Sequence, residues 1–91
     1  MLKIFGCDPG KRERLILERG LDLYDMAALF EDARALDFID DRYDYGEERR
    51  VRIGKAFGFV FTLIYTIRGD MTWLITAWPA NRKERDRYDK R

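Results

Sequence analysis

The chain has 91 residues, of which 46% are hydrophobic, 38% are charged and 14% are aromatic. This length predicts a single domain over residues 1–91, and the apolar fraction indicates a packed core rather than a disordered chain. The one cysteine, Cys7, excludes an internal disulfide and a multi-cysteine metal site. The lack of histidine excludes imidazole ligands and Ser–His or Cys–His nucleophile pairs, so neither a metal site nor a cofactor is expected.

The chain opens with a predicted strand and helix. Residues 2–5 form a short apolar run that is typical of a strand. Asp8 and Pro9 suit the start of a helix and Gly20 suits its end, which predicts a charged, surface helix over residues 9–19.

A second helix and a short strand follow. Asp22 suits the start of the helix, and its apolar residues recur at the spacing of one buried helical face: Leu23, Met26, Ala27 and Phe30. Residues 35–39 then predict a strand, and the polar, turn-rich residues 40–48 predict an exposed loop.

The second half of the chain predicts a three-stranded meander and a helix. The strands are expected over residues 49–55, 59–66 and 71–78, joined by short turns and ended by Pro79. Asn81 with Glu84 is typical of a helix start and predicts a basic helix over residues 82–90. The predicted fold is therefore α+β, with an antiparallel sheet that combines this meander with the shorter N-terminal strands. The two N-terminal helices should pack on one sheet face and leave the other partly open.

Charge is strongly polarised along the chain. Residues 1–21 carry five bases and three acids, residues 22–48 carry two bases and ten acids, and residues 49–91 carry eleven bases and four acids. The acidic and basic segments either pair across the fold or leave a basic face for nucleic acid. The residues that could form such a face are Arg49, Arg50, Arg52, Arg68, Arg82, Lys83, Arg85 and Arg87.

The two tryptophans offer a second kind of surface. Trp73 and Trp78 are five positions apart on one predicted strand, so strand alternation puts them on opposite faces. One should lie in the core, and the other should expose a ring that could stack on a base or bind a protein partner.

Taken in order, these landmarks resemble the BrnT family, the toxins of BrnT/BrnA type II toxin–antitoxin systems, whose fold is like that of RelE ribonucleases. The resemblance covers nearly the whole chain and rests on the following residues: Phe5, Asp8, Lys11 and Gly20; Phe30, Glu31 and Asp32; Glu48, Arg49, Ile53 and Gly54; Arg68; Leu74 to Ala80; and Arg82, Glu84, Arg85 and Tyr88. Several family positions are altered in this chain, namely Cys7, Leu15, Glu18, Arg19, Trp73 and Trp78.

The resemblance implies a metal-independent endoribonuclease that a cognate, BrnA-like antitoxin neutralises. It implies catalytic roles for Glu48, Arg49, Arg68 and Lys11, with Glu48 as the general base and the cations on the phosphate. Further RNA contacts are expected from the remaining basic candidates: Arg50, Arg52, Arg82 and Arg85.

Two other functions stay open at this point. In the first, Trp73 and Trp78 replace family arginines in a catalytically degenerate domain, which acts as a protein-binding inhibitor or adaptor, for example one encoded by a phage or mobile element. In the second, the chain binds nucleic acid without cleaving it. The N-terminus lacks the apolar region of a signal peptide, and the apolar stretch at residues 57–67 is too short to span a membrane, so a cytoplasmic location is expected.

Overall fold

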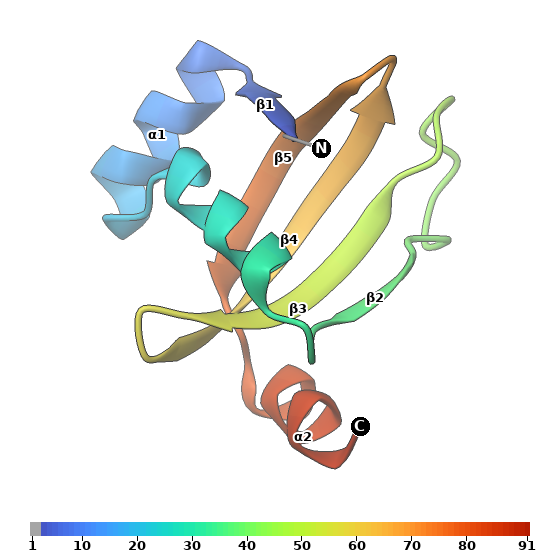
Figure 1. Ribbon diagram of the computed structural model, residues 1–91. Helices are drawn as coiled ribbons and strands as arrows, with labels where there is room; N and C mark the ends of the chain where they lie inside the picture. Colours follow the sequence, from blue (N-terminus) through green and yellow to red (C-terminus); the bar gives the residue numbers. More distant parts are fainter. Residues whose placement is uncertain (1–2) are drawn as a thin grey trace.

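A five-stranded mixed sheet carries three helices (Figure 1) in a computed structural model that describes residues 3–91. The strands are β1 (Ile4–Cys7), β2 (Leu36–Ile39), β3 (Arg50–Ala56), β4 (Phe59–Arg68) and β5 (Met71–Pro79). The helices are α1 (Pro9–Arg19), the 3-10 helix η1 (Leu23–Glu31) and α2 (Arg82–Lys90). The predicted α+β class is confirmed. Leu2, which the prediction included in the first strand, lies outside the described residues.

The strand order is β1-β5-β4-β3-β2, and the predicted meander is formed by β3, β4 and β5. The prediction of a purely antiparallel sheet is wrong, because β1 pairs with β5 in parallel, with Ile4 opposite Met71 and Cys7 opposite Leu74. Hairpins force consecutive strands to run antiparallel. No hairpin joins β1 to β5, because α1, η1 and three strands lie between them in the chain, so their relative direction is free.

Local signals set the ends of the two α-helices where they were predicted. The carboxylate of Asp8 accepts a hydrogen bond from the Lys11 N–H at 2.9 Å at the start of α1, and Gly20, with φ of 64°, ends it. At α2, the side chains of Asn81 and Glu84 each accept a hydrogen bond from the other residue's main-chain N–H.

The second helix differs from its predicted pattern. Its buried residues are Leu23, Met26 and Leu29, which recur every three residues, as in a 3-10 helix. The expectation of one face with α-helical spacing identified Leu23 and Met26 but missed Leu29. Asp22 precedes the helix as predicted, and its carboxylate accepts from the Tyr24 N–H at 3.0 Å.

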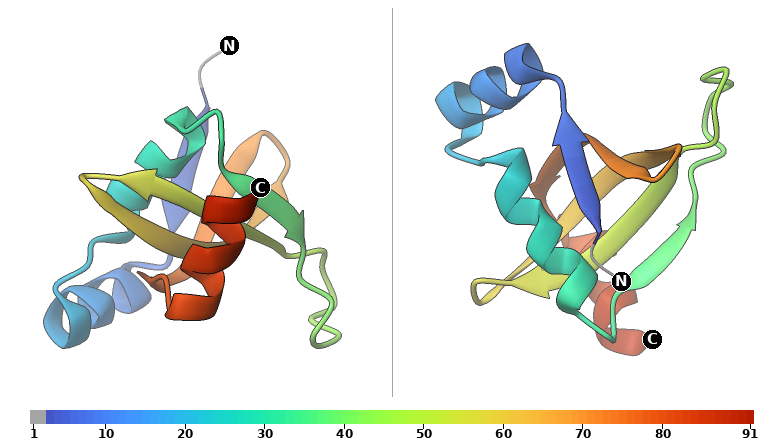
Figure 2. Two further views of the ribbon diagram at one scale, coloured as in Figure 1. Left: turned by 90° about the horizontal axis from the view of Figure 1, so that it is seen from below. Right: turned by 45° about the horizontal axis from the view of Figure 1, so that its top comes forward.

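Helices cover the two faces of the sheet unequally. On the face that we refer to as the η1 face, Leu15 of α1 and the buried residues of η1 pack on Leu63, Tyr65 and Leu74. On the opposite face, the α2 face, Tyr88 packs with Val51, Ile53 and Ile64. The right-hand view of Figure 2 shows η1 in front of the strands and α2 behind them, at one end. Residues of both N-terminal helices thus pack on one face, although the second is a 3-10 helix, and α2 packs on the opposite face.

Within residues 3–91, no helix has the length and apolar character needed to cross a membrane.

Candidate functional site

Two of the predicted catalytic residues, Arg49 and Arg68, meet at one carboxylate. Nε of Arg49 donates to Oε2 of Glu47 at 3.3 Å, and Nη2 of Arg68 donates to Oε2 at 3.2 Å and to Oε1 at 3.3 Å. The side chains of Arg49, Glu47 and Arg68 are 26%, 28% and 49% exposed. We refer to these three residues as the arginine–glutamate cluster. All three side chains are therefore partly accessible to solvent.

The cluster depends on how the segment before β3 is attached to the sheet. Oγ1 of Thr66 on β4 donates to the main-chain carbonyl of Glu48 at 2.6 Å, and the N–H of Asp40 donates to the carbonyl of Arg49 at 2.8 Å. These bonds fix the segment to β4 on one side and to the end of β2 on the other. The Glu48 side chain is exposed and makes no hydrogen bond to the other residues that the structure describes. The carboxylate of this cluster therefore belongs to Glu47, and Glu48 contacts β4 through its main chain.

Each arginine of the cluster lies over an aromatic ring. The guanidinium carbon of Arg49 is 4.2 Å from the ring centroid of Tyr45, and that of Arg68 is 4.9 Å from the ring of Trp73. Tyr43, which is 71% exposed, meets Tyr45 edge to face with 5.8 Å between their ring centroids. Cation–π contact and the shared carboxylate together hold the two guanidinium groups side by side.

Hydrogen bonds to the arginines favour the ionised form of the Glu47 carboxylate. The hydrogen bond from Arg68 is the main reason that the pKa of Glu47 lies below its ordinary value; burial opposes this effect, and the bond from Arg49 adds to it. Buried Asp40 accepts two hydrogen bonds from Arg42, at 2.8 and 2.9 Å, and these lower the pKa of Asp40. Asp40 also accepts from the Tyr45 hydroxyl at 3.2 Å, which fixes the ring beneath Arg49.

Arg50 and Arg52, predicted to bind RNA, lie on the η1 face and are engaged inside the fold. Nε of Arg50 donates to Asp37 at 2.7 Å, and Nη1 of Arg52 donates to the same carboxylate at 3.1 Å. The Tyr65 hydroxyl donates to Asp37 at 2.5 Å, and burial followed by this bond raises the pKa of Tyr65 to about 12. Nε of Arg52 also donates to the carbonyl of Leu29 at 2.9 Å, which ties β3 to η1. The structure thus separates these two arginines from Arg49.

The other predicted RNA-site residues are spread over the molecule. Lys11 lies on α1, beyond the β1 edge, whereas Arg49 precedes β3 on the far side of the strand order (Figure 1). Arg82 and Arg85 lie on α2, where Nη1 of Arg85 donates to the carbonyl of Ala80 at 2.9 Å. The structure therefore brings together Arg49 and Arg68 but not Lys11, Arg82 or Arg85.

The prediction that the two tryptophans occupy opposite faces is wrong. Trp73 pairs with Thr66 and Trp78 pairs with Thr62, which are four residues apart on β4 and so share a face. The cause is an irregularity of register at Ile64 and Tyr65, which adds one residue to β5 relative to β4. Trp78 packs against the α2 cluster, and its Nε1 donates to Glu84 at 3.1 Å, so this ring is used inside the fold.

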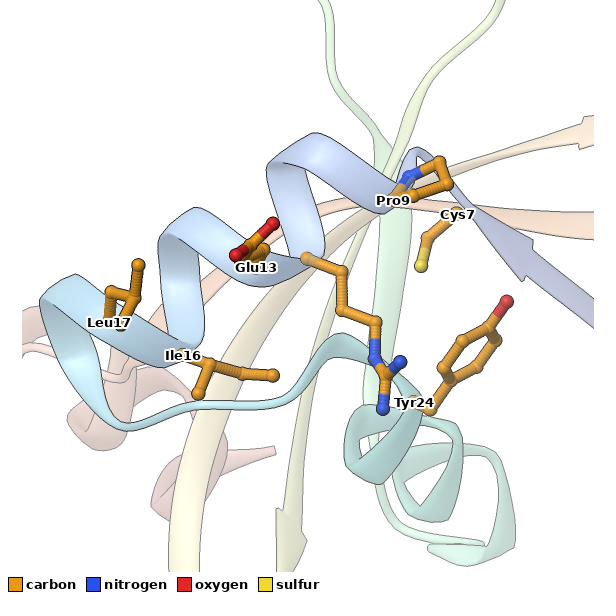
Figure 3. Close-up of a pocket in the computed structure, with 7 residues that line it drawn as sticks. Cys7, Pro9, Glu13, Ile16, Leu17 and Tyr24 are labelled. Atoms are coloured by element: carbon orange, nitrogen blue, oxygen red, sulfur yellow. The ribbon is translucent and has the colours of Figure 1, made fainter.

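A cavity of about 540 Å³ lies between α1 and the start of η1 (Figure 3). Its lining includes Cys7, Ile16, Leu17 and Tyr24, and none of the cluster residues. Cys7 is a free, buried cysteine, and its interaction with Tyr24 is the main cause that raises the pKa of that tyrosine. Across residues 3–91, no group of three or more His, Cys, Asp or Glu side chains is placed to hold a metal ion.

Sequence reasoning missed Glu47 and Tyr45 at the site. Tyr45, Glu47 and Arg49 are alternate residues in a segment that leads into a strand. Alternate side chains of a strand share a side, so this spacing could have indicated that the three lie together. The family motif contains the neighbouring residue, Glu48, instead.

The sheet, its helices and the pair of partly exposed arginines that share one carboxylate define a small α+β protein. Residues 7–84 match the family described as the ribonuclease toxin, BrnT, of type II toxin–antitoxin systems. Since the match spans most of the 91 residues, the chain belongs to the BrnT family, and the predicted membership is confirmed. A toxin of this type implies an RNA substrate and an antitoxin partner. The comparison with curated proteins gave no match.

Proposed function

We propose that this chain is an endoribonuclease that cleaves RNA without a metal ion, acts in the cytoplasm, and is neutralised by a cognate antitoxin. The observation that carries the proposal is the arginine–glutamate cluster. It places two guanidinium groups and one carboxylate on an accessible surface, in a chain of the BrnT ribonuclease toxin family.

The cluster suits a phosphodiester because a carboxylate already occupies the position that a phosphate would take. Arg49 and Arg68 converge on the oxygens of Glu47 within 3.3 Å, and guanidinium groups bind phosphate oxygens in the same planar manner. In the transition state, negative charge on the phosphorane oxygens increases, so fixed cations at this position stabilise it more than the ground state.

Glu47 is the proposed general base. When a phosphate takes over the two arginines, Glu47 loses the bonds that depress its pKa and gains an anionic neighbour, and both changes raise its proton affinity. It then accepts the proton of the 2′-hydroxyl as that oxygen attacks the adjacent phosphorus. The bond from phosphorus to the 5′-oxygen of the next nucleotide breaks, and this oxygen takes a proton from solvent. The products are a 2′,3′-cyclic phosphate and a free 5′-hydroxyl.

The test is cleavage of a labelled RNA by purified protein in the presence of a chelator. We expect cleavage that ends in a 2′,3′-cyclic phosphate. We expect Glu47→Gln to lower its rate by about 100-fold through loss of the general base, and Arg49→Ala to lower it by about 100-fold through loss of a group that stabilises the transition state. Glu48→Gln is the matched control, because this neighbour is exposed and its carboxylate lies outside the cluster. Cleavage that survives Glu47→Gln and disappears in Glu48→Gln would return the role of base to Glu48.

The antitoxin is expected to inhibit by covering this partly exposed cluster. If the antitoxin binds the Arg68→Ala variant with the affinity of the wild type and inhibits it fully, the antitoxin binds elsewhere.

The alternative function, a degenerate domain that only binds protein, rests on Trp73 alone, because Trp78 is engaged with Glu84. Absence of cleavage at high protein concentration, together with absence of growth arrest on expression, would favour that alternative.

A further inference from the structure

Each of the two arginines that meet at Glu47 lies over an aromatic ring of its own. Tyr45 lies under Arg49, and Trp73 lies under Arg68, while Glu47 joins the two arginines. A phosphodiester has the same arrangement, since one nucleoside is attached on each side of the phosphate. A phosphate held between Arg49 and Arg68 would therefore have one aromatic ring close to each of the two guanidinium groups.

We propose that Trp73 and Tyr45 stack on the bases that flank the bound phosphate, so that this site accepts single-stranded RNA and rejects duplex. The proposal rests on the proposed function only for the position of the phosphate. Bases in a duplex have both faces covered by neighbours, whereas bases of a single strand can turn out and stack on aromatic rings or on guanidinium planes.

Both rings are held in place for this role. A Cβ atom on Gly6 of β1 would lie 3.0 Å from the Trp73 ring, so the strand backbone supports the ring closely from β1. Tyr45 is fixed through its hydroxyl by buried Asp40. A ring that is already positioned loses little conformational freedom when a base stacks on it.

The two tryptophans of the chain allow a direct measurement. Trp73 belongs to the proposed site, and Trp78 lies against α2, with its Nε1 bonded to Glu84. The variant Trp78→Phe leaves Trp73 as the single fluorescent reporter, and Trp73→Phe leaves Trp78 as the matched control. The probe is a short single-stranded 2′-O-methyl RNA, which lacks the nucleophilic hydroxyl and so binds without being cleaved.

We expect the single strand to quench the fluorescence of the Trp78→Phe protein and to leave that of the Trp73→Phe protein nearly unchanged. The same sequence as a duplex, and inorganic phosphate, should quench little. Equal quenching by duplex and single strand, or equal quenching of the two reporters, would overturn the proposal.

Affinity gives the second readout. We expect Trp73→Leu to weaken binding of a dye-labelled single strand by about 5- to 150-fold, the loss that corresponds to one base–aromatic stack, and Trp73→Phe to restore most of it. Unchanged affinity in Trp73→Leu would overturn the stacking role. This measurement separates the stacking from the proposed function. If Trp73→Leu loses binding while the wild type shows no cleavage, the stacking is supported and the ribonuclease activity is contradicted. If the wild type and Trp73→Leu both cleave RNA, and each cleaves single strand and duplex equally, the ribonuclease activity is supported and the stacking is contradicted.

Discussion

Replacing Asp37 with alanine tests whether Arg50 and Arg52 serve the fold rather than RNA. The Asp37 carboxylate accepts from Arg50 at 2.7 Å, from Arg52 at 3.1 Å and from Tyr65 at 2.5 Å, and it is only 19% exposed. Its removal leaves the partly buried guanidinium groups of Arg50 and Arg52 without their shared carboxylate, although Arg52 keeps its bond to the Leu29 carbonyl. Breaking a buried ion pair costs about 3–5 kcal/mol, and partial exposure lowers this, so we expect a loss of about 3 kcal/mol in the free energy of unfolding.

For a domain of this size, that loss corresponds to a fall of about 12–24 °C in Tm, because each kcal/mol shifts Tm by about 4–8 °C. The measurement is thermal unfolding followed by circular dichroism, with Asp41→Ala as the control, because Asp41 is an exposed carboxylate in the nearby loop. A Tm of Asp37→Ala within a few degrees of the wild type would refute the reasoning. A rise in RNA affinity with no loss of stability would instead assign both arginines to RNA.

Three further outcomes follow from contacts described above. Four carboxylates have lower pKa values in the folded protein than in the unfolded chain: Asp22, Asp32, Asp40 and Glu47. The bonds that lower these pKa values stabilise the fold at pH values above the pKa of the unfolded carboxylates. This stabilisation is lost as the pH falls and the carboxylates become protonated. Urea unfolding should therefore show stability that is flat near neutral pH and falls below about pH 4–5; stability that rises on acidification would contradict this. Gly6→Ala should lower stability by about 1–3 kcal/mol, because the new methyl group would lie 2.6 Å from Sδ of Met71 and 3.0 Å from Trp73. Gly10→Ala in α1 is its control, and equal unfolding midpoints for the two variants would argue against close packing at Gly6. Asn81→Ala should cost about 1 kcal/mol through loss of the α2 cap, and a variant with the wild-type Tm would show that α2 is held by packing alone.

The sequence was sufficient wherever the signal was local. Asp8 with Gly20, and Asn81 with Glu84, act on main-chain groups within one turn of helix, so the bounds of α1 and α2 follow from a few neighbouring residues. The three meander strands were also predictable within two residues, because alternation and turn residues are read over short windows.

The features that the sequence could not supply depend on distant partners. The direction of β1 is set by its pairing with β5, a contact between the two ends of the chain. The face of Trp78 changed because one residue was added to β5 relative to β4, and a single such shift reverses every later side chain. The carboxylate that contacts Arg49 and Arg68 is that of Glu47, and the bond between Thr66 and the Glu48 carbonyl holds the segment in this position.

Because the bridging carboxylate of Glu47 sits where the substrate's phosphate is expected, the resting protein competes with its own ligand. Neutralising that side chain removes the competitor and the proton acceptor together. A Glu47→Gln protein should thus hold intact RNA more tightly than the wild type while failing to cut it, which would make it a reagent for capturing the natural target from cells.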